Sequence, residues 1–151
     1  MSNRAIYRKI LVAVDLTHHP ENILAKAAAL ANDPEAVLHL VHVITPIDDA
    51  LYASGLSMLS PVMDTSSLQQ EAVEAAKTRL AELATTCPMK RVRTEVLLGQ
   101  PGREICLAAK NDHSDLIVIG SHGKHGAQLL LGSTATAVLH HAPCDTLAVR
   151  T

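Results

Sequence analysis

The chain has 151 residues, a formal net charge of −2 and 48% hydrophobic residues, which together predict a single globular domain spanning residues 1–151. Scattered Lys and Arg, two Tyr and no Phe or Trp provide neither a basic surface nor an aromatic platform, and this argues against nucleic-acid binding. No apolar run approaches the roughly 18 residues needed to cross a membrane, and three widely spaced cysteines without a C-x-x-C pair are typical of a reducing compartment, so we expect a cytoplasmic protein without a membrane partner.

The first third of the chain predicts two buried strands around one helix. Residues 10–14 form an apolar run that ends at Asp15, and residues 36–44 form a second run rich in leucine and β-branched residues. Between them, residues 18–31 show helical periodicity, with Pro20 tolerated in the first turn.

The middle of the chain is less regular. Residues 45–66 contain Pro46, Gly55 and Pro61 and predict a long loop, which would be functional or mobile. Residues 67–84 predict a long helix, and residues 91–98 alternate charged and apolar side chains as an edge strand does. Residues 103–110 predict a short helix after the turn at Gly99 and Pro101.

The last part predicts a strand at residues 116–119, a helix at residues 134–141 and a final strand at residues 146–150. Strands that alternate with helices along a chain are typical of a parallel sheet covered by helices on both faces. We therefore predict an α/β fold with a doubly wound parallel sheet.

A glycine-rich segment follows the strand at residues 116–119. It contains Gly120-Ser-His-Gly123 and then Gly132-Ser133, directly before the last helix. Glycines let backbone N–H groups approach a phosphate, and a helix N-terminus adds free donors and the positive end of a dipole. We therefore expect a phosphate site at the carboxyl end of the sheet. The alternative is that these glycines serve only tight turns; the segment matches neither a Walker loop nor G-x-G-x-x-G.

Four side chains near this segment are candidates for ligand contact. Asp15 could contact a ribose hydroxyl or a phosphate-bound Mg²⁺, or it could cap the turn before Thr17. Ser133 and Thr134 open the last helix, where Ser133 could cap the helix, donate its hydroxyl to a phosphate, or do both. His122 could face the phosphates. The nine histidines predict no specific metal site, and no acid–base pair or G-x-S-x-G elbow identifies a catalytic residue.

These motifs occur together in one known family. The stretches concerned are Lys9-Ile-Leu-Val-Ala-Val-Asp15, His42-Val43, Leu98-Gly-Gln-Pro-Gly102, Asp115-Leu-Ile-Val-Ile-Gly-Ser-His-Gly123, Leu131-Gly-Ser133 and Ala142-Pro-Cys-Asp-Thr-Leu-Ala-Val-Arg150. With them the chain resembles the universal stress proteins over nearly its full length. The resemblance implies a five-stranded parallel sheet of order 3-2-1-4-5 and homodimers that pair through the last strand, here Thr146 to Val149.

One branch of that family binds ATP through a G-x2-G-x9-G-[ST] pattern. By resemblance, Gly120, Gly123, Gly132 and Ser133 would hold the phosphates and ribose. Ala13, Val14 and Asp15 would line the nucleotide, Val43 would border the adenine, and Ile119 would lie nearby. This chain has eight residues between Gly123 and Gly132, where the family pattern has nine.

The sequence thus favours a stress-response sensor or regulator that binds an adenine nucleotide, ATP with Mg²⁺, and hydrolyses it slowly at most. One alternative is a nucleotide-free dimeric module that binds partner proteins. The other is an enzyme of related fold that hydrolyses ATP or transfers nucleotidyl groups. The enzyme alternative lacks the S-G-G-x-D-S loop and the H-I-G-H signature of such enzymes.

Overall fold

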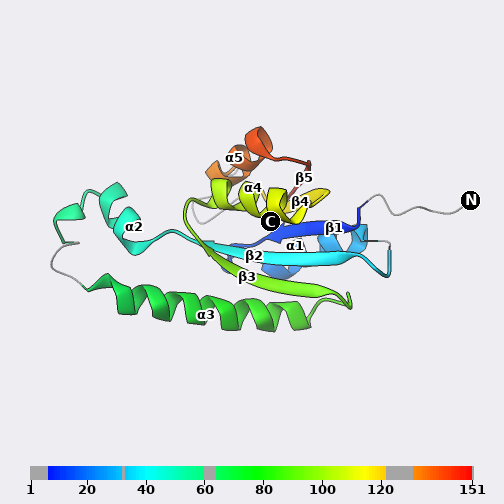
Figure 1. The fold of residues 1–151 in the computed structure, drawn as a ribbon, viewed down its shortest axis with the longest axis horizontal. Helices are drawn as coiled ribbons and strands as arrows, with labels where there is room; N and C mark the ends of the chain where they lie inside the picture. The colour runs from blue at the N-terminus through cyan, green and yellow to red at the C-terminus, as the bar shows by residue number, and fades with distance from the viewer. Residues whose placement is uncertain (1–6, 32, 60–63, 122–130, 151) are drawn as a thin grey trace, which may run out of the picture.

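Strands and helices alternate along most of the chain. The computed structural model describes residues 7–31, 33–59, 64–121 and 131–150. The elements are β1 (Lys9–Ala13), α1 (Pro20–Leu30), β2 (Val37–Ile44), α2 (Ile47–Ala53), the 3₁₀ turn η1 (Ser57–Leu59), α3 (Thr65–Thr85), β3 (Val92–Leu98), α4 (Pro101–Asp112), β4 (Leu116–Gly120), α5 (Ser133–His141) and β5 (Asp145–Val149). Figure 1 shows their arrangement around the sheet.

The sheet has five parallel strands in the order β3-β2-β1-β4-β5. The central strand β1 pairs on one side with β2 and on the other with β4, so that Leu11 lies opposite both His39 and Ile117. The predicted α/β fold class and the strand order implied by the family resemblance are confirmed. β3 lies at one edge of the sheet, as its alternating sequence predicts, and β5 lies at the other.

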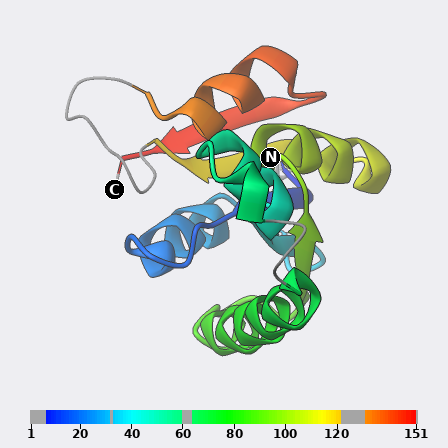
Figure 2. The ribbon, with the colours of Figure 1, turned by 90° about the vertical axis from the view of Figure 1, so that its left-hand side faces the viewer.

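Helices cover both faces of the sheet (Figures 1 and 2). On one face, Ile10 and Val12 of β1 belong to a buried cluster that includes residues of α1 and α3. On the other face, Leu11 and Ala13 belong to a second cluster with residues of α4 and α5. Alternate residues of one strand therefore face two separate cores, and this explains why β1 reads as a continuous apolar run.

Aliphatic side chains build both cores. The largest fully buried residues are Ile10, Leu11, Leu24, Leu38, Leu40, Leu80, Ile117, Val12, Val41, Val118 and Val138. Burying each such side chain stabilises the fold by about 1.5–3 kcal/mol. The two tyrosines lie outside this set: Tyr7 is half-buried, and Tyr52 is 78% exposed on α2.

The segment predicted as a loop at residues 45–66 contains α2 and η1, so that prediction was wrong in part. α2 buries none of its residues, which explains why the sequence carries no periodic apolar signal for it. The backbone N–H of Ile47 donates to Oε1 of Gln69 at 3.0 Å and ties the start of α2 to α3. α3 begins earlier than predicted because Asp64 caps it, accepting a hydrogen bond from the N–H of Ser66 at 3.1 Å.

The turn between β3 and α4 is sharp. Gly99 has a φ of 144°, and its N–H donates to the carbonyl oxygen of Ile44 at 3.0 Å. α4 begins at Pro101, before the predicted residue 103, because proline is suited to the first position of a helix. Within the described residues, no helix combines the length and the apolar character needed to span a membrane.

Candidate functional site

The carboxyl ends of β1 and β4 lie side by side in the middle of the sheet. Ala13 at the end of β1 pairs with Ile119 of β4. The chain leaves β1 toward α1 on one face, whereas the helix that follows β4 packs on the opposite face. This reversal of the winding is the position at which open α/β sheets bind their ligands.

The apolar residues expected to line a nucleotide form the floor of this region. Ala13, Val14 and Ile119 are each 5% exposed. Ala13 and Ile119 belong to the core beneath α4 and α5, with half-buried Val43 packed against it, while Val14 belongs to the other core. These residues lie at the ends of neighbouring strands. Asp15, which follows β1, and Gly120, the last residue of β4, remain partly accessible.

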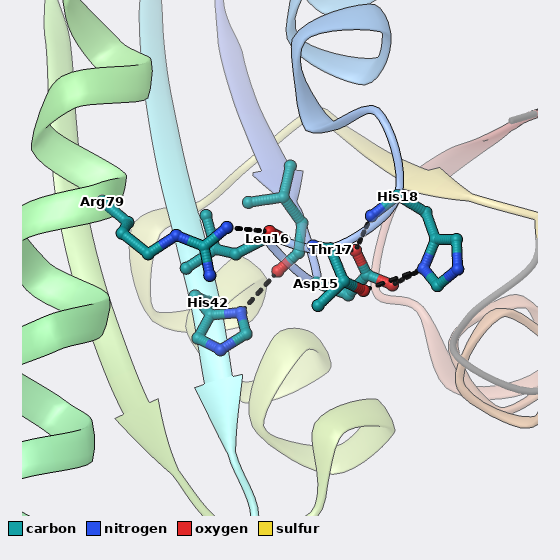
Figure 3. Close-up of polar contacts among 7 residues, drawn as sticks. Asp15, Leu16, Thr17, His18, His42 and Arg79 are labelled. Carbon is teal, nitrogen blue, oxygen red and sulfur yellow. Dashed lines mark hydrogen bonds and ion pairs between the residues drawn. The ribbon is translucent and has the colours of Figure 1, made fainter.

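The Asp15 carboxylate organises the loop after β1 (Figure 3). Its Oδ1 accepts hydrogen bonds from the N–H groups of Thr17 at 2.9 Å and His18 at 3.1 Å, and the Nδ1 atom of His18 lies 3.4 Å from Oδ2. Partial burial alone would raise the pKa of Asp15, but these hydrogen bonds hold it below its ordinary value. Asp15 therefore caps the turn before Thr17, as one of the two sequence interpretations held. It does so chiefly through Oδ1, one of its two carboxylate oxygens.

The backbone of this loop is strained and is held by two distant side chains (Figure 3). Leu16 has a φ of 62° and His19 a φ of 44°, both in the left-handed region. The Nδ1 atom of His42 in β2 lies 2.7 Å from the carbonyl oxygen of Val14, and Nη2 of Arg79 in α3 donates to the carbonyl oxygen of Leu16 at 2.5 Å. Neither the His42 nor the Arg79 side chain was predicted from the sequence to hold this loop.

Backbone hydrogen bonds fix the start of α5 beside the end of β4. The N–H of Ser121 donates to the carbonyl oxygen of Val149 at 2.7 Å, and the N–H of Gly132 donates to that of Ser121 at 2.8 Å. Gly132 occupies the N-cap in an extended conformation, and no side-chain hydrogen bond of the described residues caps the helix. The capping role considered for Ser133 is therefore wrong, and its role toward a phosphate stays a prediction. Ser133 is exposed and Thr134 is half-buried in the first turn.

Part of the predicted phosphate site lies outside the described residues. His122 and Gly123 lie outside the described residues, whereas Gly120, Gly132 and Ser133 lie within them. The consequence of the eight-residue spacing before Gly132 therefore stays a prediction.

A pocket of about 460 Å³ lies between the first turn of α4 and the length of α5. Its lining residues are Gln100, Pro101, Gly102, Arg103, Ser133, Thr134, Ala137 and His141. Two helix N-termini and the Arg103 guanidinium contribute positive potential here, which favours an anionic ligand. Sequence reasoning named Ser133 and Thr134 but gave no site role to the α4 side of this pocket, although the motif Leu98-Gly-Gln-Pro-Gly102 was the available signal.

Two other kinds of chemistry lack support in the described part of the chain. Within the described ranges, no group of three or more His, Cys, Asp or Glu side chains is arranged to hold a metal ion. Cys106 and Cys144 are half-buried, and burial raises the pKa of both thiols. Neither is therefore the low-pKa thiolate that nucleophilic catalysis requires.

The chain is similar to known proteins both in sequence and in fold. Residues 6–150 match the model of the Universal stress protein family. The chain is 39% identical over 145 residues to the Universal stress protein A homolog 2 of Coxiella burnetii, with 95% of each chain covered. Among solved structures, the hypothetical protein MJ0577 superposes with a TM-score of 0.78 at 24% identity, covering 97% of each chain.

Two further solved structures carry ligands. A universal stress protein in complex with cAMP superposes with a TM-score of 0.61 at 20% identity, covering 96% of this chain and 98% of the other. The universal stress protein of Archaeoglobus fulgidus in complex with dAMP superposes with a TM-score of 0.58 at 22% identity, covering 95% and 98%. Since the family model spans nearly all of the chain and the Coxiella relative is similar over nearly its whole length, the chain belongs to the universal stress protein family.

Proposed function

We propose that this protein binds an adenine nucleotide, ATP with Mg²⁺, at the carboxyl ends of β1 and β4, and acts as a stress-response sensor or regulator. The observation that carries the proposal is the hydrogen bond from the N–H of Gly132 to the Ser121 carbonyl oxygen. It holds the N-terminus of α5, which no side chain of the described residues caps, beside the strand that neighbours the Asp15 loop. Backbone N–H groups at such a helix start are suited to phosphate.

Each predicted residue has a role in this proposal. Phosphates would meet the backbone at Gly120, Gly123 and Gly132, the Ser133 hydroxyl, Thr134 and His122. Asp15 would contact the ribose or the metal through Oδ2, since Oδ1 already accepts two backbone N–H groups. Ala13, Val14, Val43 and Ile119 would lie against the nucleoside. Related proteins solved with cAMP and dAMP support the choice of an adenine nucleotide.

The positive charge at the start of α4 and α5 suits a phosphate group. Arg103 lines the pocket that also includes Ser133 and Thr134, and a guanidinium binds phosphate oxygens in a bidentate manner. When bound, Mg²⁺ would neutralise phosphate charge and would require carboxylate or phosphate oxygens as ligands.

We propose that the bound nucleotide is a signal and that hydrolysis is slow at most. Asp15 is the carboxylate at the end of β1, and hydrogen bonds keep its pKa below the ordinary value. A general base works best with a pKa near the working pH, so Asp15 is poorly suited to activate water. Turnover on the order of 10 s⁻¹, an ordinary enzyme rate, would contradict this part of the proposal and favour the enzyme alternative.

Calorimetric titration tests the binding. Mg·ATP, AMP and GTP are titrated into protein from which nucleotide has been removed, and we expect saturable micromolar affinity for the adenine nucleotides, about −8 kcal/mol. Ser133→Ala should weaken the affinity about tenfold, the effect of losing one hydrogen bond. Ser67→Ala, an exposed serine on α3, is the matched control and should bind like the wild type.

The absence of heat at two temperatures for every nucleotide would refute the binding proposal. A nucleotide-free module that binds partner proteins would then be favoured. In either case we propose that the protein acts in the cytoplasm. We also propose that it is a homodimer that pairs through β5, because among the described strands β5 lies at the edge of the sheet beside β4, and Leu147 is 36% exposed.

A further inference from the structure

Two side chains from different elements hold the backbone of the loop after β1. His42, half-buried near the end of β2, contacts the carbonyl oxygen of Val14 at 2.7 Å. Arg79, in the middle of α3, donates to the carbonyl oxygen of Leu16 at 2.5 Å. The two acceptors stand on either side of Asp15 in the chain, and Figure 3 shows both donors approaching the loop on the side away from His18.

The conformation that they hold is an unfavourable one. Leu16 adopts a φ of 62° and is 5% exposed, so a bulky residue sits in the left-handed region inside the core. Such residues persist only where the surroundings impose the conformation. The two hydrogen bonds to the carbonyl oxygens of Val14 and Leu16 help to impose this backbone conformation. Their donors lie 28 and 63 residues away in the chain.

The contact to Val14 also determines the tautomer of His42. A carbonyl oxygen can only accept, so Nδ1 of His42 must carry the proton. The neutral ring is therefore the Nδ1–H form, with Nε2 unprotonated. This gives the His42 interaction a signature that is independent of any ligand.

We propose that His42 and Arg79 are positioning residues for nucleotide binding, which hold the Val14–Asp15–Leu16 backbone in the conformation that presents the Asp15 carboxylate to the ligand. This inference rests on the proposed function. If the loop were released, the binding conformation would be populated only part of the time, and the apparent affinity would fall by that fraction. Neither residue needs to touch the nucleotide.

Matched substitutions separate positioning from general packing. His42→Asn places its side-chain N–H near the position of Nδ1 and should retain the bond to Val14, whereas His42→Leu removes the donor. Arg79→Met keeps most of the side-chain stem and removes the donor to Leu16. Lys77→Met is the control on the same helix, because Lys77 is exposed and pairs with Glu74 of the same helix.

The first measurement uses no nucleotide. NMR hydrogen exchange follows the amides of Thr17 and His18, which donate to Oδ1 of Asp15 in the intact loop. We expect both amides to exchange faster in His42→Leu and Arg79→Met and at the wild-type rate in His42→Asn and Lys77→Met. Ring nitrogen shifts of the wild type should show the Nδ1–H tautomer of His42. If His42→Leu does not fold, Arg79→Met carries the test, since Arg79 is exposed.

The second measurement is the affinity for Mg·ATP. We expect a loss of about tenfold in His42→Leu and Arg79→Met and wild-type affinity in His42→Asn and Lys77→Met. Amide exchange at Thr17 and His18 that is unchanged in Arg79→Met and in a folded His42→Leu, or an Nε2–H tautomer in the wild type, would overturn the positioning role. A wild type that binds no nucleotide would instead refute the proposed function and, with it, the ligand part of this inference, even if the loop readouts behave as expected.

Discussion

A Cβ atom built on Gly102 would lie 2.6 Å from the Cβ of Ala137, so α4 and α5 meet there at a distance that only glycine permits. This contact lies in the wall of the pocket that also contains Ser133 and Thr134. The close approach of the two helices therefore determines how near the α4 N-terminus lies to the proposed phosphate site.

Gly102→Ala should push the two helices apart. We expect a loss of about 1–3 kcal/mol in the free energy of unfolding, as for other overpacked sites, together with weaker nucleotide binding. Urea denaturation and calorimetry measure the two effects. Ala137→Gly in the same chain removes the methyl group that is struck, so the double variant should regain binding. Equal affinities in the single and double variants would show that the spacing of the helices has no bearing on the site.

Asp112 gives a pH-dependent contribution to stability. At the end of α4 it contacts Arg93 and the buried ring of His39, whose Nε2 lies 2.8 Å from Oε2 of Glu95. Burial alone would raise the pKa of Asp112, but Arg93 and His39 outweigh it and lower that pKa. A carboxyl group with a lower pKa in the folded state than in the unfolded state, about 3.9 there, stabilises the fold at neutral pH and loses this effect as the pH falls through the folded value.

Asp112→Asn should therefore be less stable than the wild type by about 1 kcal/mol at neutral pH. The difference should shrink as the pH falls below about 4, because the wild-type carboxylate then becomes protonated. Urea denaturation at a series of pH values measures this, with Glu82→Gln, an exposed acid on α3, as the control. A stability difference that is constant with pH would contradict the electrostatic explanation.

The edge strand β5 offers a test of the proposed dimer. Leu147→Lys places a charge on an edge strand, which disfavours pairing with another chain. We expect sedimentation velocity to show a monomer, with the free energy of unfolding of the monomeric unit changed by less than about 1 kcal/mol. Leu107→Lys, at a 41% exposed position on α4, should leave the dimer intact. Dimers in both variants would place the interface elsewhere.

We predict that replacing Gly99 destabilises the fold more than replacing Gly55, the other described glycine with a positive φ. At its φ of 144° a side chain is strained, and a Cβ would lie 2.8 Å from the side chain of Glu104. Gly99→Ala should cost about 1–3 kcal/mol of unfolding free energy. Gly55 has a φ of 76°, and no described residue lies within 4 Å of a Cβ there, so Gly55→Ala should cost about 1 kcal/mol. Thermal denaturation of the two variants compares them directly, and equal losses would show that backbone strain at Gly99 is minor.

The sequence predicted the fold well where apolar runs are long and buried on both sides. The strand expected at residues 116–119 is β4, which ends one residue later at Gly120. α2 was missed because it is short and buries nothing, so its residues leave no periodic signal. The start of α3 was predicted two residues late because the Asp64 side chain caps the helix, a local signal that apolar periodicity does not reveal.

The location of the candidate site was predictable and its details were not. Parallel strands place their carboxyl ends at one edge, and the strand order implied by the family resemblance makes β1 and β4 neighbours, so Asp15 and Gly120 were expected to lie close together. The sequence could not show that Oδ1 of Asp15 is engaged by Thr17 and His18, although the turn alternative was recognised. The contacts from His42 and Arg79, and the pocket wall at Gly102, depend on tertiary packing between elements that are far apart in the chain.

The aliphatic cores have a practical consequence for spectroscopy. With two tyrosines and no tryptophan in the chain, the protein itself absorbs weakly in the near ultraviolet. An adenine ring retained through purification would therefore dominate the absorbance spectrum of the sample. A single tryptophan introduced at exposed Tyr52 would report only on α2, free of any background from the core.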